Sequence, residues 1–440
     1  MRSRYGRRQW ARLTLLVLFG WMLGCGSRTE VPSQGFRPLV TDAVVFWDRQ
    51  TTESAALLKA LADEFNRSTP GLPVRIERAG TYADIFRKVT ASIQARALPA
   101  MAVAYESMVV EYIPTGAVIP LDALMHDPEL GFSESELSDF YPQILERNRY
   151  EAAGGRYYSF PFAKSVLVLY YNRRVLHEAG IESPPQTWDE FLDQCRRIKE
   201  KTGKFAYAIS VDCSTIDGMI FSMGGQVVHG TETLFNSEEA HAVFALLETL
   251  TREKLAYQIS PGSFDDEVAL GNDQIAFMIR TSSSKLHVQA LMNDPTRWGI
   301  APLPQRDPKH PATVLFGPNV VIFATTEEQQ RRAWAFVRYF VQPEVQARWC
   351  TVTGYLPVRR SVLEHPLVKK SWEEWADNRV PYSCLEYARG EPNLPGWQEV
   401  RLHVERAETE VITGVKDVST ALRDLKEAAD AALQRHASLH

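Results

Sequence analysis

The order of apolar segments between residues 43 and 106 constrains the fold most. Residues 43–47, 74–79 and 100–106 are short apolar runs of the kind that form buried strands. The segments between them carry apolar residues at helical spacing, namely Leu57, Leu58, Leu61 and Phe65, then Ile85, Phe86, Val89 and Ile93. Strand, helix, strand, helix, strand in this order predicts an α/β lobe.

A second series of strands and helices begins after residues 158–172, and a chain of 440 residues is too long for one core. Capping boxes are expected at Thr81–Asp84 and Thr187–Glu190, where each side chain of the pair can cap a backbone amide. The sequence predicts further strands at 274–280 and 298–305. Two α/β lobes are therefore expected.

Composition and motifs exclude several classes of function. The net charge is −5, and no basic stripe is present, which disfavours nucleic-acid binding. No catalytic signature of the hydrolase, P-loop or zincin type occurs, and the ten histidines are scattered. We expect no enzyme activity, no metal and no cofactor. A pair of glycosidase carboxylates stays open, because it depends on separation in space.

The N-terminus has the form of an export signal. Five arginines precede an apolar run that ends in "MLGC", with Gly24 before Cys25. This resembles a bacterial lipobox, in which Cys25 carries the lipid and becomes the mature N-terminus; the alternative is a plain secretory peptide. We expect a signal peptide over 1–24 and a lipid-anchored flexible tether over 25–41. The protein would then face the periplasm or the outside of the cell.

The other four cysteines leave their redox state open. Cys195 and Cys213 could form a bridge in an oxidising envelope, but buried free thiols are an equal alternative for all four.

Several motifs together resemble the extracellular solute-binding proteins of ABC importers that take up sugars and polyols. They are "GTYADI", "VAYES", "FAKS", "FMIRTSSS", "LFGPN" and "GYLP", in the family's order. Within that family the likeness is greatest to the subgroup that binds glycerol-3-phosphate and its diesters. The resemblance implies a two-lobed periplasmic-binding-protein fold of type II, with crossing hinge strands and a ligand cleft between the lobes.

The resemblance also implies a set of cleft residues. These are Tyr82, Glu106, Ser165, Thr281, Ser282, Gly317 and Tyr355. Trp47 and Asp48 stand where the subgroup has "WH", so an acid is expected near the cleft. A late arginine should meet phosphate; Arg389 lies a few residues early and Arg401 a few late, and we assign the role to Arg389. A neutral oligosaccharide is thus at least as good a candidate ligand as a phosphate.

The residues themselves support this reading only in part. Glu106 is expected at the end of the strand in 100–106, where ligands of open α/β sheets bind. Trp47, Tyr82 and Tyr355 could stack on sugar rings, but Trp47 could equally belong to the core, and Gly317 to a simple turn. Gly354 and Pro357 fix Tyr355 at the end of a helix. Tyr355 could therefore either fill space in the core or contact the ligand.

The expected protein is therefore a monomeric binding lipoprotein that captures a carbohydrate, polyol or glycerol phosphate derivative for ABC permease subunits. An envelope glycan hydrolase and a ligand sensor without transport are the alternatives. The lobes are expected to comprise 42–170 with 298–342, and 171–297 with 343–440.

Overall fold

The structure is a computed structural model that describes residues 35–437 of the 440. The expected signal peptide, the expected lipid attachment at Cys25 and most of the expected tether fall on residues outside the described ones.

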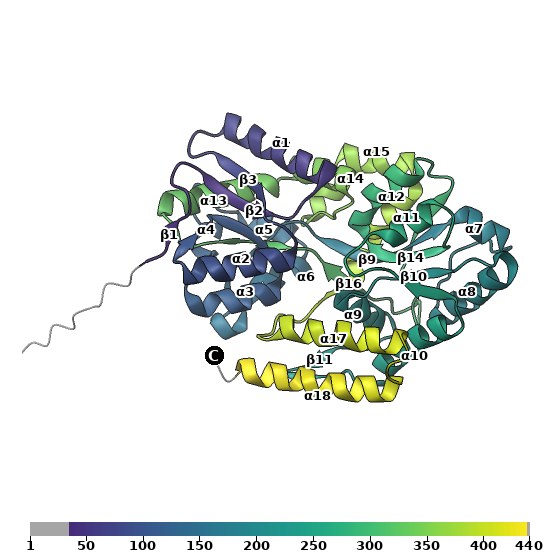
Figure 1. Ribbon diagram of the computed structural model, residues 1–440. Helices are drawn as coiled ribbons and strands as arrows, with labels where there is room; N and C mark the ends of the chain where they lie inside the picture. Colours follow the sequence, from purple (N-terminus) through teal and green to yellow (C-terminus); the bar gives the residue numbers. More distant parts are fainter. Residues whose placement is uncertain (1–34, 438–440) are drawn as a thin grey trace, which may run out of the picture. The chain divides into compact units, whose positions relative to one another are not determined.

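The first half of the chain, together with one strand from the second half, forms a five-stranded sheet with helices on both faces (Figure 1). Its strands, in spatial order, are β3 (Val74–Arg78), β2 (Val44–Asp48), β5 (Met101–Ala104), β17 (Asn319–Ile322) and β8 (Phe160–Pro161). The helices that alternate with the first three are α1 (Thr52–Ser68), α2 (Tyr82–Gln94) and α3 (Glu106–Tyr112). Strands β3, β2 and β5 run parallel, as the alternation predicts, and β17 is antiparallel to β5. One detail differs from the prediction: β5 ends at Ala104, and Glu106 begins α3.

A second sheet is built mainly from later segments. Its order is β13 (Ala256–Gln258), β10 (Tyr207–Ile209), β14 (Phe277–Thr281), β9 (Ser165–Asn172), β16 (Thr313–Phe316) and β18 (Ala388–Gly390), with β15 (Trp298–Pro302) also paired to β9. Its helices include α7 (Arg173–Glu178), α8 (Trp188–Thr202), α9 (Cys213–Ser222), α10 (Glu238–Arg252), α11 (Asp265–Gly271) and α12 (Lys285–Met292). The predicted strand at 274–280 is confirmed, shifted by a few residues.

Helices dominate the C-terminal third. They are α13 (Glu327–Phe340), α14 (Pro343–Thr353), α15 (Pro366–Glu374), α16 (Val380–Cys384), α17 (Trp397–Ile412) and α18 (Val418–Ala437). Figure 1 shows α17 and α18 side by side. No helix of the described residues is apolar over a stretch long enough to cross a membrane.

Short elements complete the chain. They are β1 (Arg37–Pro38), β4 (Ala97–Leu98), α4 (Asp122–Met125), α5 (Glu134–Asp139), α6 (Pro142–Leu145), β6 (Arg149–Tyr150), β7 (Arg156–Tyr157), β11 (Val228–His229) and β12 (Glu232–Thr233).

The helix-end signals act as predicted. In both expected capping boxes, at Thr81–Asp84 and Thr187–Glu190, the hydroxyl accepts from the third residue's amide and the acid accepts from the Thr amide. Gly354 ends α14 with a left-handed φ of 73°, a conformation that costs glycine little. These caps fix the starts of α2 and α8 and the chain direction after α14.

Sheet membership differs from the expected lobe boundaries. The chain passes from the first sheet to the second between β8 and β9, returns between β16 and β17, and crosses to the second sheet again between β17 and β18. Strands β15 and β16 pair in the second sheet, although 298–342 was assigned to the first lobe. Their apolar alternation is that of any buried strand, so sequence could not identify the partner sheet.

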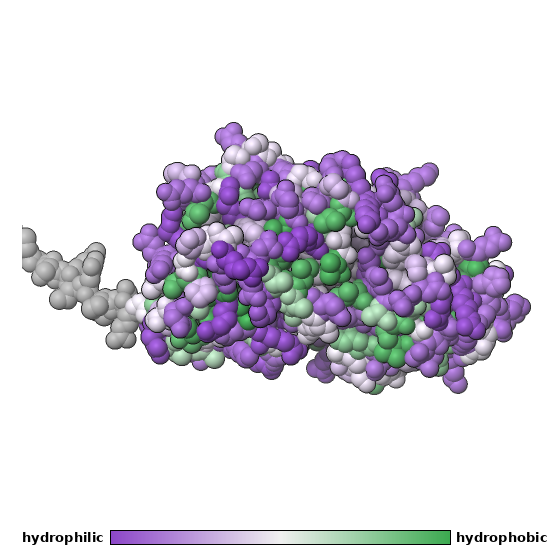
Figure 2. Space-filling view, turned by 90° about the horizontal axis from the view of Figure 1, so that it is seen from above, coloured by the Kyte–Doolittle hydropathy of each residue, from purple (hydrophilic) through white to green (hydrophobic). Residues whose placement is uncertain are grey.

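The four cysteines that the structure describes are buried and free, so no bridge joins Cys195 to Cys213. Seen from above, the surface is mainly hydrophilic, with hydrophobic residues in separate small patches (Figure 2).

Candidate functional site

Three parallel strands bring several expected site residues to one edge of the first sheet. Strand β2 ends there with Asp48, β3 leads into Tyr82 at the start of α2, and β5 is followed by Tyr105. The carboxyl ends of parallel strands share an edge, which is where α/β sheets bind ligands. The candidate site therefore includes this edge of the sheet.

Asp48 is linked to Tyr355 through Gln50. Asp48 is 1% exposed, and its Oδ2 accepts a 2.6 Å hydrogen bond from the Gln50 amide. The Gln50 side chain donates to the Tyr355 hydroxyl at 3.1 Å. Burial raises the pKa of Asp48 to about 6, against the backbone hydrogen bonds from Gln50 and Arg49 and the positive charge of Arg49.

Tyr355 also belongs to the core. It is 5% exposed, and its ring stacks on Trp349 with centroids 5.6 Å apart and planes 11° apart. The ring therefore fills space beside α14, while the hydroxyl faces the group at the end of β2. The two expectations for Tyr355 are compatible in this geometry.

A column of arginines and tyrosines crosses from the first sheet to α17. The Arg49 guanidinium lies 4.9 Å from the Tyr82 ring centroid, and the Tyr82 and Tyr105 centroids are 4.3 Å apart. Beyond them, Arg401 lies 5.7 Å from the Tyr105 ring. Burial raises the pKa of both tyrosines, so they remain neutral donors at neutral pH.

The sequence analysis did not name Arg49, and it assigned the late arginine to Arg389 rather than to Arg401. Arg389 is exposed and donates to the Gly225 carbonyl at 3.4 Å, whereas Arg401 stands over Tyr105. Arg401, and not Arg389, thus lies against the tyrosines that follow the first sheet, because α17 carries it there. The sequence signal that could have pointed to Arg49 is its position as a basic residue directly after a buried strand.

Acidic residues surround Arg401. It donates to Glu391 and, at 2.9 Å, to the Ser214 hydroxyl, and it lies 3.4 Å from Asp212. Cys213, Asp217 and Glu391 place possible ligand atoms within 4.8 Å of one another. The cation that this cluster holds is the Arg401 guanidinium, since Glu391 is already its ion-pair partner.

Glu106, Lys164 and Gly317 form a second group beside the first. Glu106 Oε1 lies 3.3 Å from Lys164 Nζ and 3.6 Å from Arg147 Nε. Burial alone would raise the pKa of Glu106, but the two cations outweigh it and hold the pKa at about 2. Lys164 also donates to the Gly317 carbonyl at 2.9 Å. Ser165, which follows Lys164, is buried as the first residue of β9.

Thr281 and Ser282 lie near the turn before Tyr355. The Tyr170 hydroxyl donates to both of their carbonyls, at 2.9 and 3.1 Å. A Cβ on Gly354 would come within 2.5 Å of the Ser282 carbonyl oxygen, so only glycine allows this approach. The Ser282 hydroxyl is buried and has no partner among the described residues.

Trp47 is not brought into this group. Successive strand residues point to opposite faces of a sheet, so Trp47 faces away from Asp48. Its indole donates instead to Glu77 on β3, at 3.3 Å.

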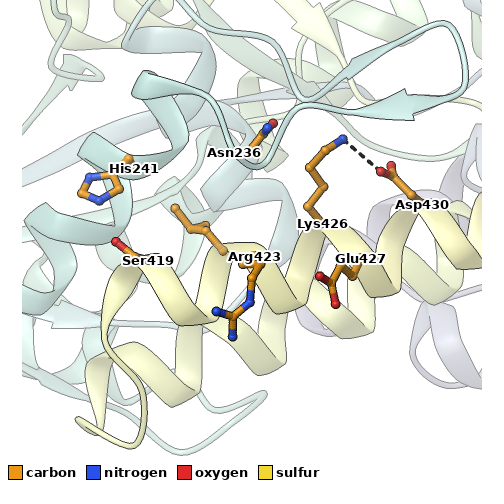
Figure 3. A pocket seen from close by; sticks show the side chains of 8 residues that line it. Asn236, His241, Ser419, Arg423, Lys426, Glu427 and Asp430 are labelled. Carbon is orange, nitrogen blue, oxygen red and sulfur yellow. Dashed lines mark hydrogen bonds and ion pairs between the residues drawn. The ribbon is translucent and has the colours of Figure 1, made fainter.

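A cavity of about 420 Å³ elsewhere on the second lobe contains none of the expected residues (Figure 3). It lies between α10 and α18, where His241, Arg423 and Glu427 line it. Its lysine, Lys426, is already paired with Glu232 at 3.0 Å and with Asp430 at 2.9 Å. We therefore do not assign solute binding to this cavity.

Comparison with known proteins identifies the family. Residues 60–376 match the model of the bacterial extracellular solute-binding proteins. The sn-glycerol-3-phosphate-binding periplasmic protein of Salmonella paratyphi A is 23% identical over 411 residues, which cover 90% of this chain and 92% of that protein. The corresponding protein of Yersinia pseudotuberculosis is 24% identical over 413 residues, covering 89% and 92%.

Solved structures show the same fold. The UgpB protein of Mycobacterium tuberculosis, in complex with glycerophosphocholine, aligns with a TM-score of 0.80 at 20% identity and covers 90% of this chain and 99% of that one. The GacH receptor of Streptomyces glaucescens aligns with a TM-score of 0.78 at 21% identity and covers 90% and 100%. The expected two-lobed fold is thereby confirmed. The family match supports the expectation of a binding protein rather than an enzyme. The chain belongs to the bacterial extracellular solute-binding proteins.

Proposed function

We propose that this protein captures a carbohydrate or polyol, or a glycerol phosphate derivative of one, and delivers it to the permease subunits of an ABC importer. The observation that carries the proposal is the column of Arg49, Tyr82, Tyr105 and Arg401, to which both lobes contribute. Flat aromatic rings suit the C–H faces of a sugar, and a few polar groups around them set its orientation.

We propose the following residues as contacts of the solute. Tyr82, Tyr355 and Asp48 would contact the solute from the first lobe, and Thr281 and Ser282 would lie beside them. Glu106, Ser165 and Gly317 would hold the hinge next to the solute. Arg401, rather than Arg389, would contact the solute from the second lobe, and Trp47 would support the strand.

Closure of the lobes is the proposed mechanism. A solute that contacts both lobes favours the closed form, because it gains contacts there that the open form lacks. The closed protein, acting as a monomer, would then dock on the permease. The relatives named for sn-glycerol-3-phosphate binding support the inclusion of glycerol phosphates.

A thermal-shift screen of the purified protein tests the proposal. The panel contains oligosaccharides, polyols and glycerophosphodiesters, and at least one should raise the melting temperature. The bound solute should be recovered chemically unchanged after denaturation. Turnover of a glycan polymer, lost on substitution of one carboxylate, would instead support a hydrolase.

Export and anchoring form a separate part of the proposal. We propose that 1–24 is removed as a signal peptide, that lipid on Cys25 holds the protein at the membrane, and that 25–41 serves as the tether. A Cys25→Ser variant should lose incorporation of labelled fatty acid and appear in the soluble envelope fraction. Retention of the label by that variant would refute the lipobox assignment.

A further inference from the structure

Arg49 has an unusual environment for an arginine of this protein. It follows β2 directly, is partly buried, and stacks over Tyr82 at 4.9 Å. Tyr105 and Tyr355 are the other groups that act on its charge. Within residues 35–437, no Asp or Glu forms an ion pair with Arg49, and no backbone carbonyl accepts a hydrogen bond from it.

Other arginines at comparable depth are paired. Arg280 binds Asp266 through two hydrogen bonds of 2.7 and 2.9 Å, and Arg359 binds Asp139 at 2.7 Å. Arg332 donates instead to the backbone carbonyls of Thr69, Pro70 and Leu72. The fold thus supplies carboxylate or backbone carbonyl acceptors to these three guanidinium groups. It supplies neither kind of acceptor to Arg49.

The neighbouring Asp48 does not fill that role. Its Oδ2 is taken by the Gln50 amide, and it makes no ion pair with Arg49. A guanidinium group carries five N–H donors, and leaving them without acceptors away from water is costly. Apart from a hydrogen bond with the Tyr82 side chain, the donors of Arg49 are therefore available to a bound molecule at the edge where β2, β3 and β5 end.

The chemistry of the missing acceptor follows from the shape of the group. Guanidinium presents parallel N–H donors that match the two oxygens of a carboxylate or phosphate, and such bonds exceed those to neutral hydroxyls in strength. The ring of Tyr82 lies against one face of the group and restricts its orientation. We propose that Arg49 recognises an anionic group, a phosphate or a carboxylate, on the solute.

This inference rests on the proposed function and narrows its ligand. It favours a phosphorylated or acidic polyol or sugar over a neutral oligosaccharide. It also places the anion at an arginine early in the chain, since Arg401 is already engaged by Glu391 and Asp212.

Paired probes test the inference by calorimetry on the purified protein. They are glycerol 3-phosphate with glycerol, glucose 6-phosphate with glucose, and glucuronate with glucose. For at least one pair, the wild type should bind the anionic member about tenfold more tightly or better. Arg49→Met should remove this preference, and Arg49→Lys should keep part of it. The phosphate and glucuronate arms distinguish the two anions.

A matched control is Arg75→Met, because Arg75 lies on β3 of the same sheet and pairs with Glu77 at the surface. This variant should keep the preference of the wild type. Preferential binding of neutral probes, or an anion preference that survives in Arg49→Met, would overturn the inference while leaving solute capture intact. A wild type that binds no member of the probe pairs and no solute of the thermal-shift panel would overturn both.

Discussion

Lys164 donates a 2.9 Å hydrogen bond to the carbonyl of Gly317, and these residues lie on two of the three segments that pass between the sheets. The segments are bonded further, since the Ala163 amide donates to Pro318 at 3.3 Å and Lys164 forms a bridge with Leu356. Glu106 approaches the same lysine at 3.3 Å. Motion of one lobe against the other must pass through this bonded crossing.

Gly317→Ala should damage the crossing severely. Gly317 has a φ of 102°, and a Cβ there would overlap the carbonyl oxygen of Ala163. We expect a loss of about 3 kcal/mol or more in the free energy of unfolding, measured by urea titration. Gly116→Ala is the matched control: φ is 69° with open space around the site, so the loss should be about 1 kcal/mol. Equal losses in the two variants would contradict the proposed close approach.

Lys164→Met should leave the carboxylate of Glu106 with one cation fewer. Lys164 is 1% exposed, and removal of one member of a buried ion pair costs about 3–5 kcal/mol. Chemical denaturation at pH 7 measures the loss. Lys369→Met removes an exposed pair with Glu364 and should cost less than about 0.5 kcal/mol. A loss that is no larger for Lys164 would mean that the pair is not buried in solution.

The local parts of this fold were predictable from sequence, and the contacts across it were not. Apolar spacing gave the alternation of strands and helices, and the pairs Thr81–Asp84 and Thr187–Glu190 marked two helix starts, because both signals lie within one turn of chain. The end of β5 was misplaced by two residues, since nothing in "AMAVAYE" marks the change of backbone at Tyr105. The pairing of β15 and β16 depends on distant partners.

The candidate site shows the same division. Asp48 ends a strand and Tyr82 begins the helix after the next strand, so both could be placed at a sheet edge from the sequence. Arg401 could not, because its contact with Tyr105 depends on how α17 lies against the first lobe.

Arg401→Met and Arg389→Met should therefore differ. Arg401 compensates Glu391, whose side chain is 14% exposed, so its loss should cost about 3 kcal/mol. Arg389 is exposed, and its substitution should change stability by less than about 0.5 kcal/mol. Solute affinity should fall only in Arg401→Met. A fall in affinity on substitution of Arg389 alone would restore the original assignment.

Stability should depend on pH through Asp48. Its pKa is 3.8 in the reference state and about 6 in the folded protein. Between these values the folded state binds more protons than the unfolded state, so stability falls as pH rises from 4 to 6 and stays lower above that. Asp48→Asn removes this loss. The stability difference between variant and wild type should shift by about 2–3 kcal/mol in favour of the variant between pH 4 and pH 7.5. The exposed Asp42→Asn should show no comparable shift.

Substitution of Tyr355 separates its core role from its ligand role. Tyr355→Ala removes a ring that stacks on Trp349 and should cost about 3–5 kcal/mol. Tyr355→Phe keeps the ring but removes the hydroxyl that accepts a hydrogen bond from the Gln50 side chain. This loss should cost about 1–2 kcal/mol. Because the hydroxyl faces the arginine–tyrosine column, Tyr355→Phe should also lower affinity for a solute found in the thermal-shift screen, about tenfold. Calorimetry on the folded Phe variant measures this. Unchanged solute affinity in Tyr355→Phe would mean that Tyr355 only fills space in the core.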